Sequence, residues 1–96
     1  MDLLTVEQFS GCVNETFRAE INDGEIEFVL VEARPIQPPP GELLRAPFSL
    51  LFRNTSSFLF PQQTYRMRHS RVGEVGIFLV PIAREREGFL YQAIFN

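Results

Sequence analysis

Cys12 and His69 are the two side chains of this sequence that could act together as a nucleophile and its base. Each is the only residue of its type, so a dyad would have to assemble from distant parts of the chain. The simpler interpretation is a small buried thiol and an exposed imidazole in a turn, which requires no such coincidence. We therefore predict no catalytic residues and no enzymatic activity.

The residue types do not support a metal centre or a cofactor site either. Structural zinc sites take several Cys and His ligands, and the chain has one of each. Lysine is absent, which excludes Schiff-base and P-loop chemistry, and no glycine-rich phosphate loop is present. We predict neither a metal nor a cofactor.

Positive charge is concentrated in one segment, at Arg66, Arg68, His69 and Arg71. Strand alternation would place Arg66 and Arg68 on one face, with the third arginine in the turn that follows. This face could bind an anion, but we favour a solvated surface with cross-strand ion pairs to Glu25, Glu27 or Glu74. Because the net charge is −3, we expect no nucleic-acid partner. An anion-binding or small-molecule-binding barrel that uses the arginines stays open as an alternative function.

Alternation of apolar and polar residues indicates that most of the chain forms strands. Six are predicted, over residues 15–22, 25–33, 48–53, 63–69, 74–82 and 89–95. Residues 77–80 are apolar on both faces, which predicts that both faces are covered, either in a central strand or in a strand capped by the helix. Because short consecutive hairpins leave edges that need protection, we predict a small antiparallel barrel or curled sheet. A chain of 96 residues builds one core, so residues 1–96 form a single mainly β domain.

The N-terminal segment predicts one short helix. Thr5 and Gln8 have the spacing of a capping box, and Gly11 is a typical helix end. A helix over residues 6–11 would direct Val6 and Phe9 toward one end of the sheet and plug it.

Asp23 and Gly24 form a two-residue turn signal in the first hairpin. A turn at these two residues pairs apolar side chains across the two strands: Ile21 with Ile26, Ala19 with Phe28 and Phe17 with Leu30. The same register opposes Glu20 to Glu27, a like-charge pair on the outer face.

Two connections carry apolar residues that cannot all point inward: Leu43, Leu44, Phe58, Leu59 and Phe60. They could form an exposed patch for self-association or a protein partner, or they could fold over the open ends of the sheet. No apolar stretch is long enough for a membrane helix, and the N-terminus lacks the pattern of a secretion signal. We therefore expect a cytoplasmic protein without a membrane partner.

Nearly the whole chain resembles an uncharacterised family of small bacterial proteins, a DUF6916-like domain of unknown function. The residues that carry the resemblance are Leu3–Phe9, Pro47–Arg53, Pro61–Arg66, Gly73–Glu74, Phe78–Pro81 and Tyr91–Asn96. Gln63 departs from the glycine usual in the family, which puts the turn before the fourth strand in question. The resemblance implies a stand-alone bacterial domain, brings no catalytic residues, and hints at phage-tail-like gene neighbours.

The sequence therefore predicts a non-enzymatic protein-interaction or structural module. Its expected partner is another protein or further copies of the same chain, in a larger bacterial or phage-tail-like assembly.

Overall fold

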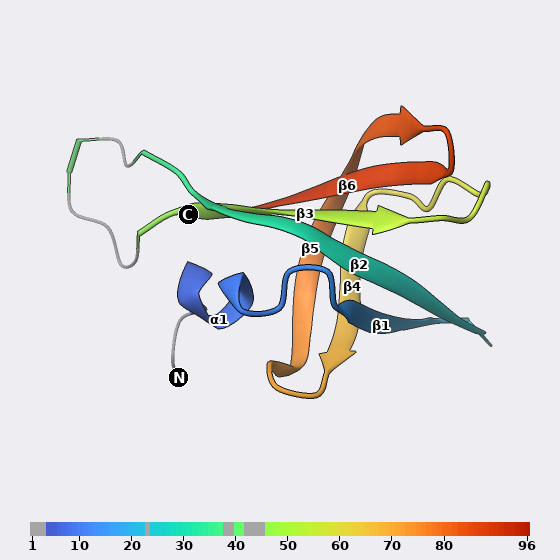
Figure 1. Ribbon diagram of the computed structural model, residues 1–96, viewed down its shortest axis with the longest axis horizontal. Coiled ribbons are helices and arrows are strands. Elements are labelled where there is room, and N and C mark those ends of the chain that lie inside the picture. The colour runs from blue at the N-terminus through green and yellow to red at the C-terminus, as the bar shows by residue number, and fades with distance from the viewer. Residues whose placement is uncertain (1–3, 23, 38–39, 42–45) are drawn as a thin grey trace.

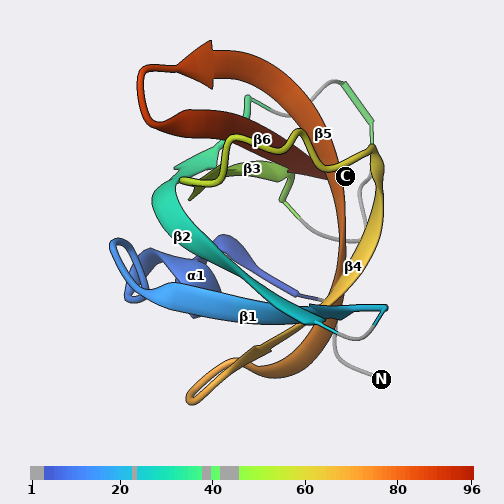
Figure 2. The same ribbon diagram turned by 90° about the vertical axis from the view of Figure 1, so that its right-hand side faces the viewer.

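The computed structural model describes residues 4–22, 24–37, 40–41 and 46–96. These residues form one helix and six strands: α1 (Val6–Ser10), β1 (Thr16–Ile21), β2 (Gly24–Pro35), β3 (Phe48–Asn54), β4 (Gln63–His69), β5 (Gly73–Glu85) and β6 (Gly88–Phe95). Neighbouring strands are antiparallel, and the sheet closes into a barrel in the order β1-β2-β3-β6-β5-β4 (Figures 1 and 2). The predicted mainly β fold with one short helix is confirmed.

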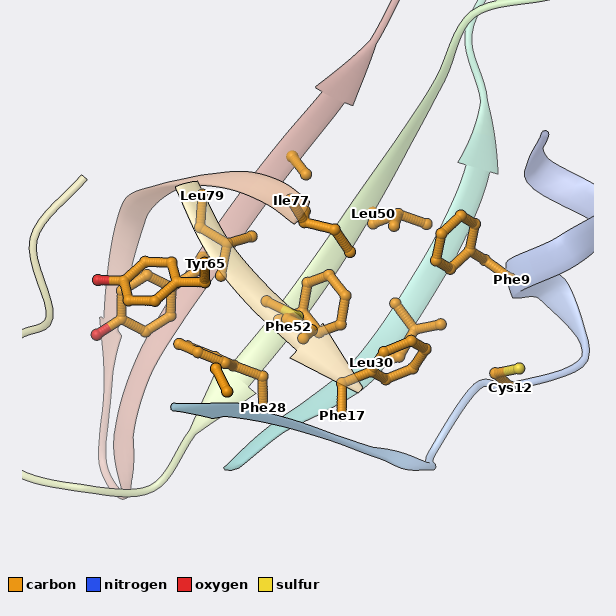
Figure 3. Packing of buried hydrophobic residues seen from close by; sticks show 14 of the residues in the cluster. Phe9, Cys12, Phe17, Phe28, Leu30, Leu50, Phe52, Tyr65, Ile77 and Leu79 are labelled. Atoms are coloured by element: carbon orange, nitrogen blue, oxygen red, sulfur yellow. The ribbon is translucent and has the colours of Figure 1, made fainter. Parts of the chain in front are cut away.

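The core consists of inward-facing residues that alternate along every strand, as the period of two requires. In β3 the buried apolar residues are Phe48, Leu50 and Phe52, and in β4 they are Tyr65 and Met67, all as predicted. Figure 3 shows aromatic and aliphatic side chains from different strands meeting inside the closed sheet. Full burial of each large side chain contributes roughly 1.5–3 kcal/mol.

Helix α1 closes one end of the barrel, as predicted. It ends at Ser10, close to the predicted boundary, and the Thr5 N–H donates to Gln8 Oε1 at 2.7 Å in the expected capping box. Phe9 is fully buried and points from the helix into the interior (Figure 3). Its ring centroid lies 6.0–6.1 Å from three others, those of Phe17, Phe48 and Phe95.

The register of the first hairpin differs from the predicted one by two residues. Ile21 pairs with Gly24 instead of Ile26, and Asn22 has a positive φ of 48°. Asp23, half of the predicted turn, lies outside the described residues. The pairs that replace the predicted ones are Ala19 with Ile26 and Phe17 with Phe28. A shift of two keeps each side chain on the same face, so the burial pattern alone cannot distinguish the two registers.

Charges on the outer face match the observed register better. Arg18 now lies opposite Glu27, with their charged atoms 3.3 Å apart, so the predicted Glu20–Glu27 pair does not form. Glu20 instead opposes Glu25, and Arg68 of β4 binds both carboxylates at 2.8 Å. Ion pairing across the strands thus relieves the like-charge contact.

Strand β5 has a neighbouring strand on each side, as every strand of the closed sheet does, and it is longer than predicted. Residues Gly73–Leu79 pair with β4, and residues Val80–Glu85 pair with β6. A register shift between Pro81 and Ala83 accommodates the proline, which has no N–H to donate to a ladder.

Gly88, at the start of β6, is required by a close backbone approach. Its φ is +120°, and an added Cβ would lie 2.0 Å from the carbonyl oxygen of Asn54. We expect Gly88→Ala to lower the free energy of unfolding by about 2 kcal/mol or more, measured by urea denaturation. Gly11→Ala is the control, because its Cβ would meet no atom within 4 Å. Equal effects of the two substitutions would contradict this account.

Candidate functional site

Cys12, Glu15 and His69 come together where the end of α1 meets the turn between β4 and β5. One potential ligand atom from each residue lies within 4.8 Å of the others. Cys12 and Glu15 belong to the connection between α1 and β1, and His69 ends β4. The fold therefore joins the two residues that the sequence singled out, together with a carboxylate that sequence reasoning missed.

The prediction of an exposed His69 was wrong. Its side chain is 4% exposed, and its ring stacks on Phe17 with a centroid distance of 4.5 Å. The alternation that buries Tyr65 and Met67 continues to residue 69, so the signal was present in the sequence. We predicted an exposed side chain because histidine is polar and residue 69 lies at the end of the strand.

Hydrogen bonds to the ring of His69 determine which nitrogen carries the proton. The backbone N–H groups of Arg71 and Val72 donate to Nδ1 at 3.1 and 3.3 Å. Nδ1 must therefore hold a lone pair, and the proton of the neutral ring lies on Nε2, which donates to Glu15 Oε1 at 2.8 Å. Both nitrogens are engaged, so neither is free to take a proton from Cys12. Proximity does not make these residues a nucleophile and its base.

The same hydrogen bonds argue against a resident metal. Thiolate, carboxylate and imidazole together suit zinc, but a metal-bound histidine normally donates its second N–H to an acceptor. At His69 that second position faces two backbone donors instead. Arg71 already supplies a cation here: its Nη2 donates to Glu15 Oε1 at 2.6 Å, to the Gly11 carbonyl at 3.0 Å and to Cys12 Sγ at 3.7 Å. The cluster is an internally satisfied network.

Glu15 is the electrostatic centre of this network. The hydrogen bond from Arg71, and then the one from His69, lower the pKa of the Glu15 carboxyl. The Glu15 carboxylate in turn raises the pKa of Arg71. These contacts connect the segment after α1 to the turn between β4 and β5.

Lowering the pH should weaken the hydrogen bonds that Arg71 and His69 donate to the Glu15 carboxylate. Because the pKa of Glu15 is below its usual 4.5 in the folded chain, its stabilising contribution is complete above that value and is lost as the pH falls through the folded pKa. Urea denaturation of the wild type and of Glu15→Gln should show the largest difference near neutral pH and a shrinking one below about pH 4.5. A difference independent of pH would contradict the assignment.

The tautomer of His69 can be read directly. We expect ¹⁵N NMR of the ring at neutral pH to show the proton on Nε2 and none on Nδ1, because Nδ1 accepts two backbone hydrogen bonds. Added Zn²⁺ should leave both ring resonances unchanged. A proton on Nδ1, or a shift with one equivalent of Zn²⁺, would contradict the network described above.

The four residues of the predicted positive surface do not form one surface in the structure. Arg66 binds Glu74 at 2.7 Å, which confirms the predicted pair, and Glu25 is bound by Arg68, also as predicted. The third candidate, Glu27, is bound by Arg18 instead. Of the other predicted members, His69 points inward and Arg71 turns back to Glu15. Each arginine of the segment therefore already has a carboxylate partner.

The apolar connection before β4 both covers one end of the barrel and exposes apolar side chains, so each of the two predicted arrangements is found in part of it. Phe60 is 7% exposed and covers the barrel end opposite α1, against Phe28. Phe58 and Leu59 are 61% and 51% exposed. The other two residues predicted for interaction, Leu43 and Leu44, lie outside the described residues.

An exposed apolar surface on β5 and β6 was not predicted. Phe78, Ile82 and Ile94 are 50%, 48% and 50% exposed, whereas the sequence had suggested that both faces of residues 77–80 are covered. Among the described residues, one five-residue helix is the only other layer, and it fills the barrel end. Within the described ranges no helix or strand lies over the outer face of β5 at Phe78, so the prediction that both faces of residues 77–80 are covered was wrong.

The fold and its side-chain networks define a small closed β domain whose chemically active residues bind one another. Residues 4–95 match the family described as Domain of unknown function (DUF6916), so the chain belongs to this family. Comparisons with curated proteins and with solved structures found no match. In the described part of the chain, no helix has the length and apolarity that a membrane crossing requires.

Proposed function

We propose that this domain is a non-enzymatic interaction module that associates with a second copy of itself. The contact surface is the outer side of β5 and β6, here named the β5–β6 surface. It comprises Phe78, Val80, Ile82, Leu90, Gln92 and Ile94. The observation that carries the proposal is the half-exposure of three large apolar side chains on two neighbouring strands.

Exposed apolar residues are ordinary when they are isolated, but a group of them marks an interaction site. On this surface the exposed residues flank Val80 and Leu90, which are only half-buried. The ladder pair Val80–Gln92 lies two residues from Phe78 along β5 and two residues from Ile94 along β6. Covering each half-exposed side chain would stabilise a complex by about 1 kcal/mol.

A second copy fits this surface because the surface is uncharged. The chain has a net charge of −3, so two copies repel each other wherever acidic faces meet. None of the six residues of the β5–β6 surface is ionisable, and an apolar face is complementary to itself across a two-fold axis. A larger bacterial or phage-tail-like assembly in the cytoplasm extends this proposal, and it is supported by the resemblance described above.

Oligomeric state tests the proposal. We expect light scattering to show a dimer of the wild-type chain, and Phe78→Ser with Ile94→Ser to raise the dissociation constant at least tenfold. Phe58→Ser is the matched control, since Phe58 is equally apolar, more exposed and outside the β5–β6 surface. Circular dichroism verifies that each variant folds. A monomeric wild type at high concentration, or equal weakening by the control, would refute self-association through this surface.

Anion binding is the second candidate, because one shallow groove collects the side chains of Arg18, Arg68 and Arg71. All three already lie within 3.3 Å of a glutamate oxygen. An anion would have to displace these carboxylates, so we rank this function below self-association.

A further inference from the structure

Strand β4 is paired along its whole length on one side only. All seven of its residues pair with β5, whereas its ladder with β1 contains two pairs, Arg18 with Arg68 and Ala19 with Met67. Beyond them β1 stays with β2 up to the pair Ile21–Gly24. Within the described ranges, Gln63–Arg66 therefore has no strand on this side, and we name this segment the β4 edge.

The start of the β4 edge, at Gln63, borders an opening between the end of β1 and the loop before β4. Residues from the end of β1, from the loop before β4 and from β4 itself line it: Glu20, Ile21, Asn22, Phe58, Phe60, Pro61 and Gln63. Figure 1 shows the paired ends of β1 and β2 extending away from β4 at this place. In an antiparallel strand, every second residue directs its N–H and C=O to the same side, so the edge presents donors and acceptors toward the opening.

The loop beside the edge is held firmly although its aromatic side chain is exposed. Asn54 Nδ2 donates to the Glu27 carbonyl at 2.8 Å, and Asn54 Oδ1 accepts the Ser56 N–H at 2.9 Å. Ser56 Oγ then accepts the Phe58 N–H at 3.0 Å. The ring of Phe58 packs edge-on against buried Phe60 at 4.9 Å. The exposed Phe58 ring is thus fixed beside the opening.

The far side of the same loop is tied to two buried tyrosines. The Phe60 N–H donates to Tyr91 Oη at 2.9 Å, and Tyr65 Oη donates to the Pro61 carbonyl. Because the loop is held at both ends, docking against Phe58 would cost little ordering entropy.

We propose that the β4 edge accepts an extended peptide segment of another protein as an additional strand. Backbone donors and acceptors that alternate along an edge match another strand, and natural proteins normally protect such edges. The peptide would hydrogen-bond to the backbone of Gln63–Arg66 and place an apolar side chain against Phe58 and Ile21. The peptide would add on the side of β4 that faces away from β5, whereas Phe78 of the β5–β6 surface is the ladder partner of Thr64 on the other side.

The outer side of the edge restricts the sequence of the peptide. Thr64 and Arg66 point outward, and Arg66 is bound to Glu74. Alternate residues of the added strand would lie beside these polar side chains, and the others would face the loop. The recognised segment therefore alternates polar and apolar residues, with a large apolar residue next to Phe58.

A displayed library of random heptapeptides, selected on the immobilised full-length chain, supplies the probe. The amide resonances of Gln63–Arg66 should shift when a selected peptide is added. Phe58→Ser should weaken its binding at least tenfold, and so should N-methylation of every second peptide amide, which removes strand hydrogen bonds. Ile94→Ser, on the β5–β6 surface, should leave the affinity unchanged.

The alternative outcomes overturn this proposal without touching self-association. Failure to enrich any peptide over an uncoated control would do so, as would enriched peptides that tolerate both N-methylation and Phe58→Ser. Hydrogen exchange of the peptide-free chain gives a further criterion. Protection of the Gln63–Arg66 amides that rises with protein concentration and persists in Ile94→Ser would show that a second copy pairs with the edge, and would exclude the peptide.

Discussion

Closure of the sheet around its aromatic side chains is the constraint on which the rest of the structure depends. The ring of Phe28 lies 5.3 Å from those of Tyr65 and Tyr91, which belong to β4 and β6. Phe17 of β1 meets Phe52 of β3 edge-on at 5.5 Å. Such contacts join strands that are distant in sequence, and edge-to-face aromatic pairs add about 0.5–1.5 kcal/mol beyond the burial of their area. A chain this short cannot supply a second core to replace them.

Filling the interior with these side chains has a direct consequence for function. The largest inward-facing side chains are apolar or, like the tyrosines, hydrogen-bonded to the loop before β4, so aromatic and aliphatic groups occupy the described interior. The polar residues that do meet, around Glu15 and His69, saturate one another. The two surfaces that we propose for recognition, the β5–β6 surface and the β4 edge, both lie on the outside of the barrel.

Much of the fold could be predicted from single residues and their spacing. Alternation in β3 and β4 placed Phe48, Leu50, Phe52, Tyr65 and Met67 in the core, and the capping box located α1. Strand register was harder, because a shift of two residues preserves the buried face of the first hairpin. The observed register is the one that brings Arg18 opposite Glu27, where the two form an ion pair. It also brings Glu20 and Glu25 opposite each other, and Arg68 of β4 binds both. These contacts depend on which strands are neighbours, which the sequence does not give.

The sequence by itself determined which side chains of β3 and β4 turn inward and that the fold is mainly β with one short helix, because local periodicity fixes the face of each strand. It left open whether the sheet closes, which the structure shows. The tertiary structure decided what lies beside what. It placed His69 and Arg71 beside Glu15, which is more than fifty residues away in the sequence. It also placed Phe78 on the outer face, where its side chain is half-exposed. It also separated β1 from the first half of β4. Each of these features depends on the length of the ladder between two neighbouring strands, which the twist of the sheet limits. Short-range patterns along the sequence do not give that length.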